Sequence, residues 1–286
     1  MSNIFWNKLI EGKKPVAAEY DPPVKADFNG YLPGINELKE AGADIITMAD
    51  CPSGRARMDA IVTAALVSRM ADVEVIPHLT CRDRNSTAVK STLLSVYASG
   101  IRNMILVTGD PVPVEDKDKV KPVFEFNSKG LISMAASMNN QFEEPLRFFG
   151  ALNINAASFK AELDRAKLKI EAGAVGFFTQ PVLTEEAFEN LRTAKNELGC
   201  FILGGIIPIT SEKNAIFMNE SVPGIKVDEK VISMYSGKDR DECEKIAIEL
   251  SAEIASRIAS YVDGFYLITP FNRTGLIAKI IDIINK

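Results

Sequence analysis

Short, almost continuously apolar runs alternate along the chain with longer segments in which apolar residues recur at helical spacing. Eight runs have the length and the Val, Ile and Phe content that are typical of β-strands. They are residues 15–20, 43–50, 73–80, 103–110, 148–155, 174–181, 201–208 and 264–270. Strands that are apolar on both faces and alternate with helices indicate a parallel sheet covered on both sides.

The segment 157–173 shows the helical pattern most clearly. Its apolar residues Phe159, Leu163, Ala166 and Ile170 are separated by four, three and four positions, and charged residues occupy the other face. This spacing predicts an amphipathic helix that packs on a neighbouring strand.

Glycines and one polar stretch indicate where helices end and where a long loop lies. Gly42 and Gly173, in the related phrases EAGAD and EAGAV, suit the left-handed residue that ends a helix before a short turn into a strand. Residues 111–127 combine Val, Pro and charges and predict a long loop, a type of segment that is often functional.

The repetition of strand and helix determines the fold class. Eight such units close a (βα)8 (TIM) barrel, which commonly uses roughly 200 to 400 residues as one domain. A doubly wound open sheet is the main alternative, but a glycine-rich loop usually follows its first strand. Here the run 15–20 leads into an aspartate and two prolines, and residues 2–11 predict a short extra helix before the barrel. We therefore predict a single (βα)8 barrel domain over residues 1–286, with a short extra N-terminal helix.

The composition is ordinary for a globular protein, with 47% hydrophobic and 25% charged residues, which argues against disorder. A net charge of -5 provides no basic face for nucleic acid. The four cysteines lack the spacing of a zinc site or a disulfide framework, so we expect reduced thiols. With no signal-peptide pattern and no apolar run near the roughly 20 residues that span a bilayer, we expect a cytoplasmic protein without a membrane partner.

Polar residues gather where the predicted strands end. In a barrel these ends meet at one mouth, which holds the active site. Any one such residue could simply cap the next helix, but carboxylates that converge from separate strands indicate chemistry. The polar residues at these ends are Glu19, Asp21, Asp50, His78, Thr80, Thr108, Asp110, Asn153, Asn155, Thr179, Gln180, Asn272 and Arg273.

Glu19 is the strongest candidate for a catalytic residue in this set. It interrupts an apolar run just before two prolines, and partial burial would raise the proton affinity of its carboxyl group. That suits a general acid working near neutral pH. His78 is the only histidine, which excludes a site with several histidine ligands, and the chain has no metal-loop motif. We therefore predict chemistry without a metal.

Six motifs follow one another along the predicted barrel: Glu19 with Pro22-Pro23, PHLTC at 77–81, TGD at 108–110, EAGAVGFFTQP at 171–181, GGIIPIT at 204–210 and TPFNR at 269–273. By these motifs the chain resembles, over nearly its full length, the methylenetetrahydrofolate reductases. Members of that family are barrels that bind FAD noncovalently in the mouth. The resemblance implies that reduced nicotinamide, NADH or NADPH, provides hydride for converting 5,10-methylenetetrahydrofolate to 5-methyltetrahydrofolate, by a ping-pong mechanism.

The resemblance also implies roles for individual residues toward the folate. Glu19 matches the general acid, which protonates N10 so that the methylene bridge opens. Asp110 matches the aspartate near both flavin and pterin, where it accepts hydrogen bonds from the amino-pyrimidine edge. Gln180 matches a residue that contacts folate and nicotinamide in turn. Arg273 matches a substrate-binding arginine that suits a folate carboxylate, and Asn214 is assigned to substrate binding.

A second set of residues is assigned to the flavin by the same resemblance. Lys169, late in its helix, could reach a pyrophosphate, although a solvated helix charge is an equally good interpretation. The flavin set comprises His78, Thr108, Gly109, Asp110, Asn153, Asn155 and Lys169.

Three departures from the family pattern leave alternatives open. Thr108 stands where many members have arginine, residues 152–158 read LNINAAS in place of a tyrosine and a histidine, and residues 48–51 read MADC. They leave open whether the cofactor is FAD or FMN and whether NADH, NADPH or a partner protein delivers the electrons. The sequence also leaves open whether the protein is a homo-oligomer. Two other functions remain as alternatives, a flavin-free folate-binding methyltransferase barrel and a folate-binding subunit of a redox complex.

Overall fold

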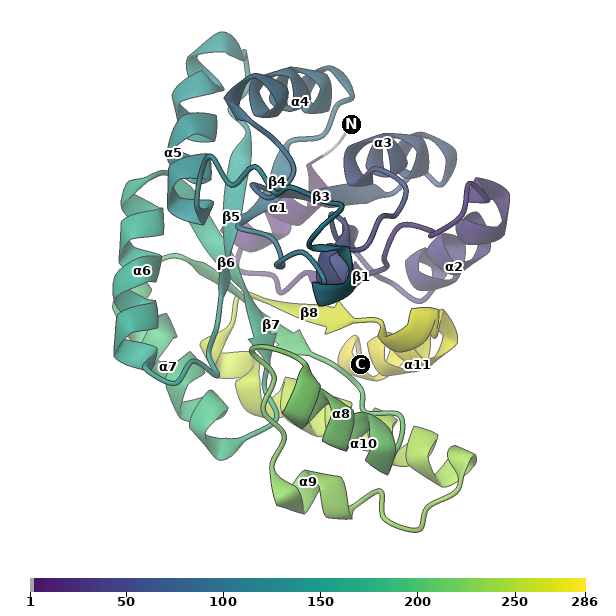
Figure 1. The fold of residues 1–286 in the computed structure, drawn as a ribbon. Helices are drawn as coiled ribbons and strands as arrows, with labels where there is room; N and C mark the ends of the chain where they lie inside the picture. Colours follow the sequence, from purple (N-terminus) through teal and green to yellow (C-terminus); the bar gives the residue numbers. More distant parts are fainter. Residues whose placement is uncertain (1–2) are drawn as a thin grey trace.

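A computed structural model describes residues 3–286, and in it eight parallel strands close a barrel in the order β1 to β8, with β8 pairing with β1 (Figure 1). The predicted barrel is confirmed. The strands are β1 (Val16–Glu19), β2 (Ile45–Met48), β3 (Glu74–Thr80), β4 (Asn103–Val107), β5 (Arg147–Leu152), β6 (Ala174–Pro181), β7 (Phe201–Ile206) and β8 (Gly264–Ile268).

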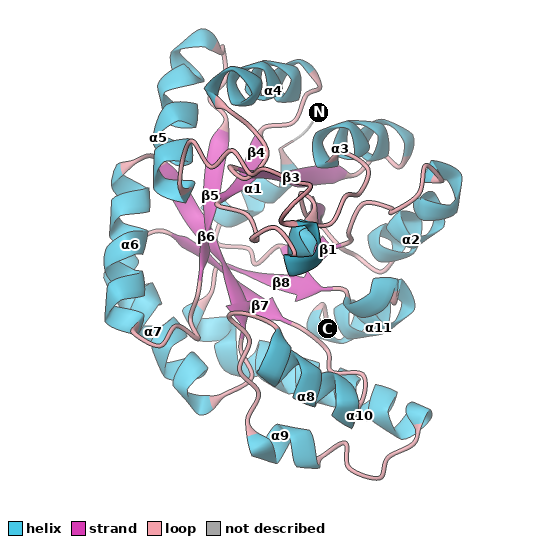
Figure 2. Ribbon diagram, in the orientation of Figure 1, coloured by secondary structure: helices cyan, strands magenta, loops and turns pink. Residues whose placement is uncertain are grey.

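Helices form a ring around the strands, as Figure 2 shows. The barrel helices are α2 (Phe28–Glu40), α3 (Ala60–Met70), α4 (Ser86–Ala98), α5 (Ser128–Ser137), α6 (Phe159–Glu171), α7 (Glu185–Leu198), α10 (Arg240–Ile258) and α11 (Thr274–Ile284). Between β7 and α10 the chain adds α8 (Glu212–Ser221) and α9 (Glu229–Ser233), which the sequence pattern did not predict. Short 3-10 turns are η1 (Pro52–Gly54), η2 (Val114–Asp116), η3 (Met138–Gln141), η4 (Ala259–Tyr261) and η5 (Pro270–Asn272).

The predicted extra helix is α1 (Ile4–Ile10), which closes the barrel at the amino ends of the strands. Residue 2, where we expected this helix to begin, lies outside the described residues. Phe5 is fully buried in the barrel interior, with its ring centroid 5.8 Å from that of Phe149 and 6.5 Å from that of Phe178. Burying such a side chain stabilises the fold by roughly 1.5–3 kcal/mol.

One apolar residue from every strand fills the centre of the barrel. This layer consists of Ala17, Ile45, Ile76, Ile105, Phe149, Phe178, Leu203 and Tyr266. Side chains alternate between the two faces of a strand, so the residues two positions further on also point inward. That next layer toward the mouth consists of Glu19, Thr47, His78, Val107, Ala151, Gln180, Gly205 and Ile268. The period of two thus places an acid, an imidazole and an amide on the floor of the mouth.

Several strands are shorter than the apolar runs from which they were predicted. The run 103–110 leaves the sheet after Val107, because Gly109 turns the chain with φ +93°. The run 148–155 leaves it after Leu152. The predicted helix ends are confirmed at Gly42 and Gly173, which have φ +101° and +114°.

Candidate active site

Glu19 is the last residue of β1, and its side chain is 17% exposed at the floor of the mouth. The Tyr266 hydroxyl, on β8, donates a hydrogen bond to its Oε2 atom. Burial raises the pKa of Glu19 to about 8, and the nearby charge of Asp21 adds to this, whereas the Tyr266 bond and Arg57 oppose it. The expected increase in proton affinity is confirmed, and this carboxyl group carries a proton at neutral pH.

His78 lies beside Glu19 on the floor of the mouth. Its Nε2 atom is 3.9 Å from Glu19 Oε2, too far for a hydrogen bond. That nitrogen is buried without a hydrogen-bond partner, and burial lowers the pKa of His78 to about 4, so the ring is neutral. A buried, unpaired ring nitrogen is a group that a bound ligand would satisfy.

The turn after β1 is held by residues that the sequence pattern did not identify. Arg57, in the loop between β2 and α3, donates to the Pro22 carbonyl at 3.0 Å, and its guanidinium lies 3.5 Å from the Asp21 carboxylate. The Tyr31 hydroxyl donates to the Tyr20 carbonyl at 2.7 Å. These contacts fix the backbone that follows Glu19.

A cavity of about 210 Å³ opens at the carboxyl ends of β4, β5 and β6. It brings together four of the predicted site residues, Thr108, Asn153, Lys169 and Gln180. Its full lining is Val107, Thr108, Ser128, Ala151, Asn153, Glu162, Lys169 and Gln180. Polar groups thus surround a small apolar floor.

Lys169 is buried against this cavity, with 9% of the residue exposed, so the interpretation as a solvated helix charge is wrong. Its ammonium donates to the Ala151 carbonyl at 2.8 Å and lies 5.8 Å from the centre of the Phe177 ring. Burial lowers the pKa of Lys169. An ammonium has three donors, so two remain for a ligand in the cavity.

Glu162 is a cavity residue that sequence reasoning missed. It lies in the first turn of α6, where its carboxylate accepts from the Asn153 backbone N–H at 3.2 Å and from Arg165. It is buried at the edge of the apolar stripe, three residues after Phe159 and four before Ala166. The one sequence signal was its position seven residues before Lys169, which places both side chains on the same face of a helix.

The Gly109-Asp110 turn lies at the rim rather than in the cavity lining. The carboxylate of Asp110 is exposed and accepts the Ser53 backbone N–H at 2.6 Å. Arg82, whose side chain is only 3% exposed, donates to the carbonyls of Asp110 and Cys51 at 3.3 and 3.2 Å. Arg82, which directly follows the motif PHLTC, therefore holds together the loops that follow β2, β3 and β4.

Asp50, another strand-end carboxylate, is occupied by structural contacts. It accepts from both the backbone N–H and the hydroxyl of Thr80, at 3.0 and 2.9 Å, and it pairs with Arg84. This carboxylate holds β2 to β3 through these contacts.

Three further predicted residues lie outside the cavity lining and are engaged by other parts of the chain. Asn155 is buried, and its amide nitrogen donates to the carbonyls of Pro181 and Gly224 at 3.0 and 2.9 Å. The side-chain oxygen of Asn214 accepts the Thr210 backbone N–H at 3.1 Å within the β7–α8 connection. The guanidinium of Arg273 pairs with Glu244 on α10.

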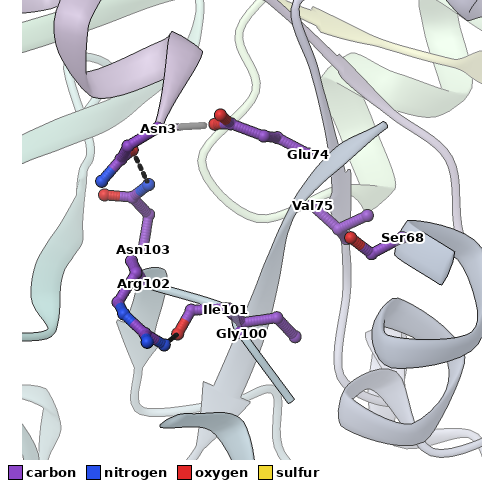
Figure 3. A pocket seen from close by; sticks show the side chains of 8 residues that line it. All are labelled: Asn3, Ser68, Glu74, Val75, Gly100, Ile101, Arg102 and Asn103. Carbon is purple, nitrogen blue, oxygen red and sulfur yellow. Dashed lines mark hydrogen bonds between the residues drawn. The ribbon is translucent and has the colours of Figure 1, made fainter. Parts of the chain in front are cut away.

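A separate crevice lies at the amino ends of β3 and β4, opposite the mouth (Figure 3). The side-chain amide of Asn103 donates to Asn3 there at 3.0 Å. The volume of this crevice is about 30 Å³, which is room for one or two waters. Among residues 3–286 there is neither a cluster of ligands that could hold a metal nor a helix long and apolar enough to cross a membrane.

The fold and the mouth define a (βα)8-barrel protein that combines a carboxyl group of raised pKa with a polar cavity at the carboxyl ends of the strands. The sequence profile of the family described as methylenetetrahydrofolate reductase matches residues 5–285. The chain belongs to this family, whose members are generally flavin-dependent.

Individual relatives agree with this family assignment. The chain is 26% identical to a 5,10-methylenetetrahydrofolate reductase from Buchnera aphidicola over 76% of this chain and 73% of the relative. It is 23% identical to that of Escherichia coli K12 over 81% and 77% of the two chains. A Clostridium thermocellum protein, described as binding two copies of 5-methyl-5,6,7,8-tetrahydrofolic acid, has the same fold, with TM-score 0.68, 14% identity and 98% coverage of both chains.

Proposed function

We propose that this protein reduces 5,10-methylenetetrahydrofolate to 5-methyltetrahydrofolate, using noncovalently bound FAD and a reduced nicotinamide as the electron source. The observation that carries the proposal is the buried, protonated carboxyl group of Glu19 on the floor of the mouth, because the substrate needs an acid before it can accept hydride.

Glu19 would act as the proton donor to N10 of the folate. The bond between the bridging carbon and N10 breaks, N10 takes the proton from Glu19, and the N5 iminium that remains accepts hydride to become the methyl group. Glu19 is left as a carboxylate, which the Tyr266 hydroxyl stabilises by its hydrogen bond. A general acid with a pKa near the working pH is effective in such a transfer.

The residues around the cavity fit a flavin cofactor, which would supply the hydride chemistry when bound. Lys169 has two unused donors for a phosphate oxygen, and the Glu162 carboxylate can accept from a ribityl or ribose hydroxyl. Val107 and Ala151 offer a flat apolar floor for a ring system. We assign His78, Thr108, Gly109, Asp110 and Asn153 to the same cofactor.

Gln180 and Asp110 would recognise the two substrates in turn. The Gln180 amide has donors and an acceptor at the cavity, which suit both a pterin and the carboxamide of a nicotinamide. Asp110 keeps acceptor capacity after binding Ser53, which suits the amino-pyrimidine edge of a folate. Because both substrates would use one place, we expect ping-pong kinetics.

The remaining predicted residues would act at a greater distance. Arg273 would exchange Glu244 for a folate carboxylate, since a guanidinium binds either one through paired hydrogen bonds. Asn155 and Asn214, assigned to cofactor and substrate by the resemblance, would support those sites through the backbone groups that they bind.

Cofactor analysis followed by stopped-flow kinetics tests the proposal. We expect the purified protein to release FAD on denaturation, identified by chromatography. Under anaerobic conditions, NADH or NADPH should bleach the flavin absorbance, and 5,10-methylenetetrahydrofolate should restore it. A protein that binds no flavin even after reconstitution would contradict the proposal, and release of FMN would correct the cofactor.

A further inference from the structure

Tyr266 lies in the central layer of the barrel, directly beneath the mouth. It is paired in register with Ala17 on β1, one inward-facing position below Glu19. Its ring is buried and packs edge-on against Phe178, with centroids 5.1 Å apart. The ring is therefore held by the core, and the hydroxyl group reaches up to the floor of the mouth.

The Tyr266 hydroxyl donates its hydrogen bond to one particular oxygen of Glu19, Oε2. Burial and the neighbouring carboxylate keep the phenol protonated, because they raise the pKa of Tyr266 well above its ordinary value. The same Oε2 atom is the one nearest to His78 Nε2, at 3.9 Å. Since a hydrogen bond from Tyr266 occupies Oε2, the proton of the carboxyl group belongs on Oε1.

Other groups that face Glu19 come from its own strand end and from the neighbouring elements. Asp21 follows it in the turn after β1, Arg57 approaches from the loop between β2 and α3, and the Tyr31 hydroxyl lies on α2. Arg57 is already engaged by Asp21 and the Pro22 carbonyl. Tyr266 thus makes the direct hydrogen bond to Glu19, whereas Asp21 and Arg57 act on it through their charge.

We infer that Tyr266 is a positioning residue for Glu19: its hydrogen bond to Oε2 keeps the transferable proton on Oε1 and stabilises the carboxylate that remains after the proton has gone to the folate. This inference rests on the proposed role of Glu19 as the acid. It gives a function to a polar group in a barrel layer that is otherwise apolar.

Tyr266→Phe removes the hydroxyl and keeps the ring that packs on Phe178. A hydrogen bond to a carboxylate favours the charged form, so its loss raises the pKa of Glu19 further. We expect the alkaline limb of the folate-dependent half-reaction to move up by about one pH unit. We also expect the plateau rate to fall by about tenfold or more, the usual effect of losing a hydrogen bond to a charged group.

A second variant should move the alkaline limb in the opposite direction. Site-specific 3-fluorotyrosine at position 266 has a more acidic phenol, which is a stronger hydrogen-bond donor. It should therefore lower the pKa of Glu19 and move the alkaline limb to lower pH. Tyr235→Phe is the matched control, because Tyr235 is buried in another part of the fold and its hydroxyl has no hydrogen-bond partner. It should leave the pH profile unchanged.

The titration of Glu19 can also be measured without turnover. Infrared difference spectra of the substrate-free protein against Glu19→Gln isolate the protonated carboxyl band, whose pH midpoint should rise in Tyr266→Phe and fall with fluorotyrosine. Unchanged midpoints and pH profiles in both variants would overturn the inference and leave Tyr266 a packing residue. If Glu19→Gln itself turns over folate at the wild-type rate, the acid role is wrong, and the inference falls with it.

Discussion

On one side of the barrel mouth, Glu19 accepts a hydrogen bond from the neutral hydroxyl of Tyr266 and lies beside the neutral ring of His78. On the other side, Lys169 and Glu162 line the cavity at the ends of β4, β5 and β6. Desolvation is the largest influence on the pKa in both places, but it has opposite uses. It keeps an acid protonated on the first side. On the second it lowers the pKa of Lys169, and the nearby carboxylate of Glu162 opposes that shift. The comparison teaches that burial shifts the pKa of an acid and that of a base in opposite directions at one ring of strand ends, while charged and hydrogen-bonding neighbours modify each shift.

The largest expected effect comes from the acid side of this comparison. Glu19→Gln keeps the size of the side chain but cannot supply a proton, so the folate-dependent half-reaction should slow by about 10²–10⁴-fold. The nicotinamide-dependent half-reaction needs no acid and should stay nearly intact. Paired stopped-flow measurements separate the two, with thermal unfolding as a check on the fold. Equal losses in both half-reactions would make Glu19 a support for the cofactor instead of a proton donor.

The next effect tests the side of the mouth that holds Lys169 and Glu162. Lys169→Met keeps the buried aliphatic length and removes the charge, so FAD affinity should fall by about 10- to 100-fold through the loss of a charge-assisted hydrogen bond. Lys167→Met, on the same helix, is the matched control, because Lys167 is exposed and pairs with Glu197 on the surface. Fluorescence titration of the apoprotein with FAD measures both. Equal affinity in the two variants would mean that Lys169 does not hold the cofactor.

A third effect concerns stability on the acid side. The pKa of Glu19 is raised to about 8 in the folded protein, so the fold favours the protonated form. Its stabilising contribution is complete below the unfolded pKa of about 4.5 and is lost as pH rises toward 8. We expect the free energy of unfolding of the wild type to fall, relative to Glu19→Gln, by about 2 kcal/mol or more over that range. Urea unfolding of both proteins at pH 5, 7 and 8.5 measures this difference in the free energy of unfolding. If the inferred pKa shift of Glu19 is wrong, the difference will not change with pH.

The two sides also differ in how far the sequence could predict them. The predicted ends of the first and sixth strands placed Glu19 and Gln180 at the mouth, and the predicted helix over 157–173 placed Lys169 before the sixth strand. Tyr266 was missed because it meets Glu19 only through closure of the barrel, across 247 positions of the chain. No local pattern can indicate such a contact.

Arg82 and Glu162 were missed for a related reason. Both are charged residues whose side chains are only 3% and 8% exposed, and each hydrogen-bonds to the backbone of a loop at the end of a strand. Conversely, Asn155 and Asn214 have the polar character of site residues, yet backbone carbonyls and N–H groups bind their side chains. Motif matching indicated loops at the barrel mouth, but it could not decide which polar side chain in each loop is left free.

The smallest effect concerns Asp110, which lies at the rim between the two sides. Asp110→Asn retains an acceptor for the Ser53 backbone N–H, so the clamp with Arg82 should persist. It removes the negative charge opposite the amino-pyrimidine edge, and a lost charge-assisted hydrogen bond predicts about a tenfold decrease in kcat/KM for the folate. The nicotinamide-dependent half-reaction should change less, because nicotinamide has no such edge. The exposed Asp118 of the same loop provides the control variant Asp118→Asn, which should behave as wild type. Equal losses in both half-reactions of Asp110→Asn would place this carboxylate on the cofactor alone.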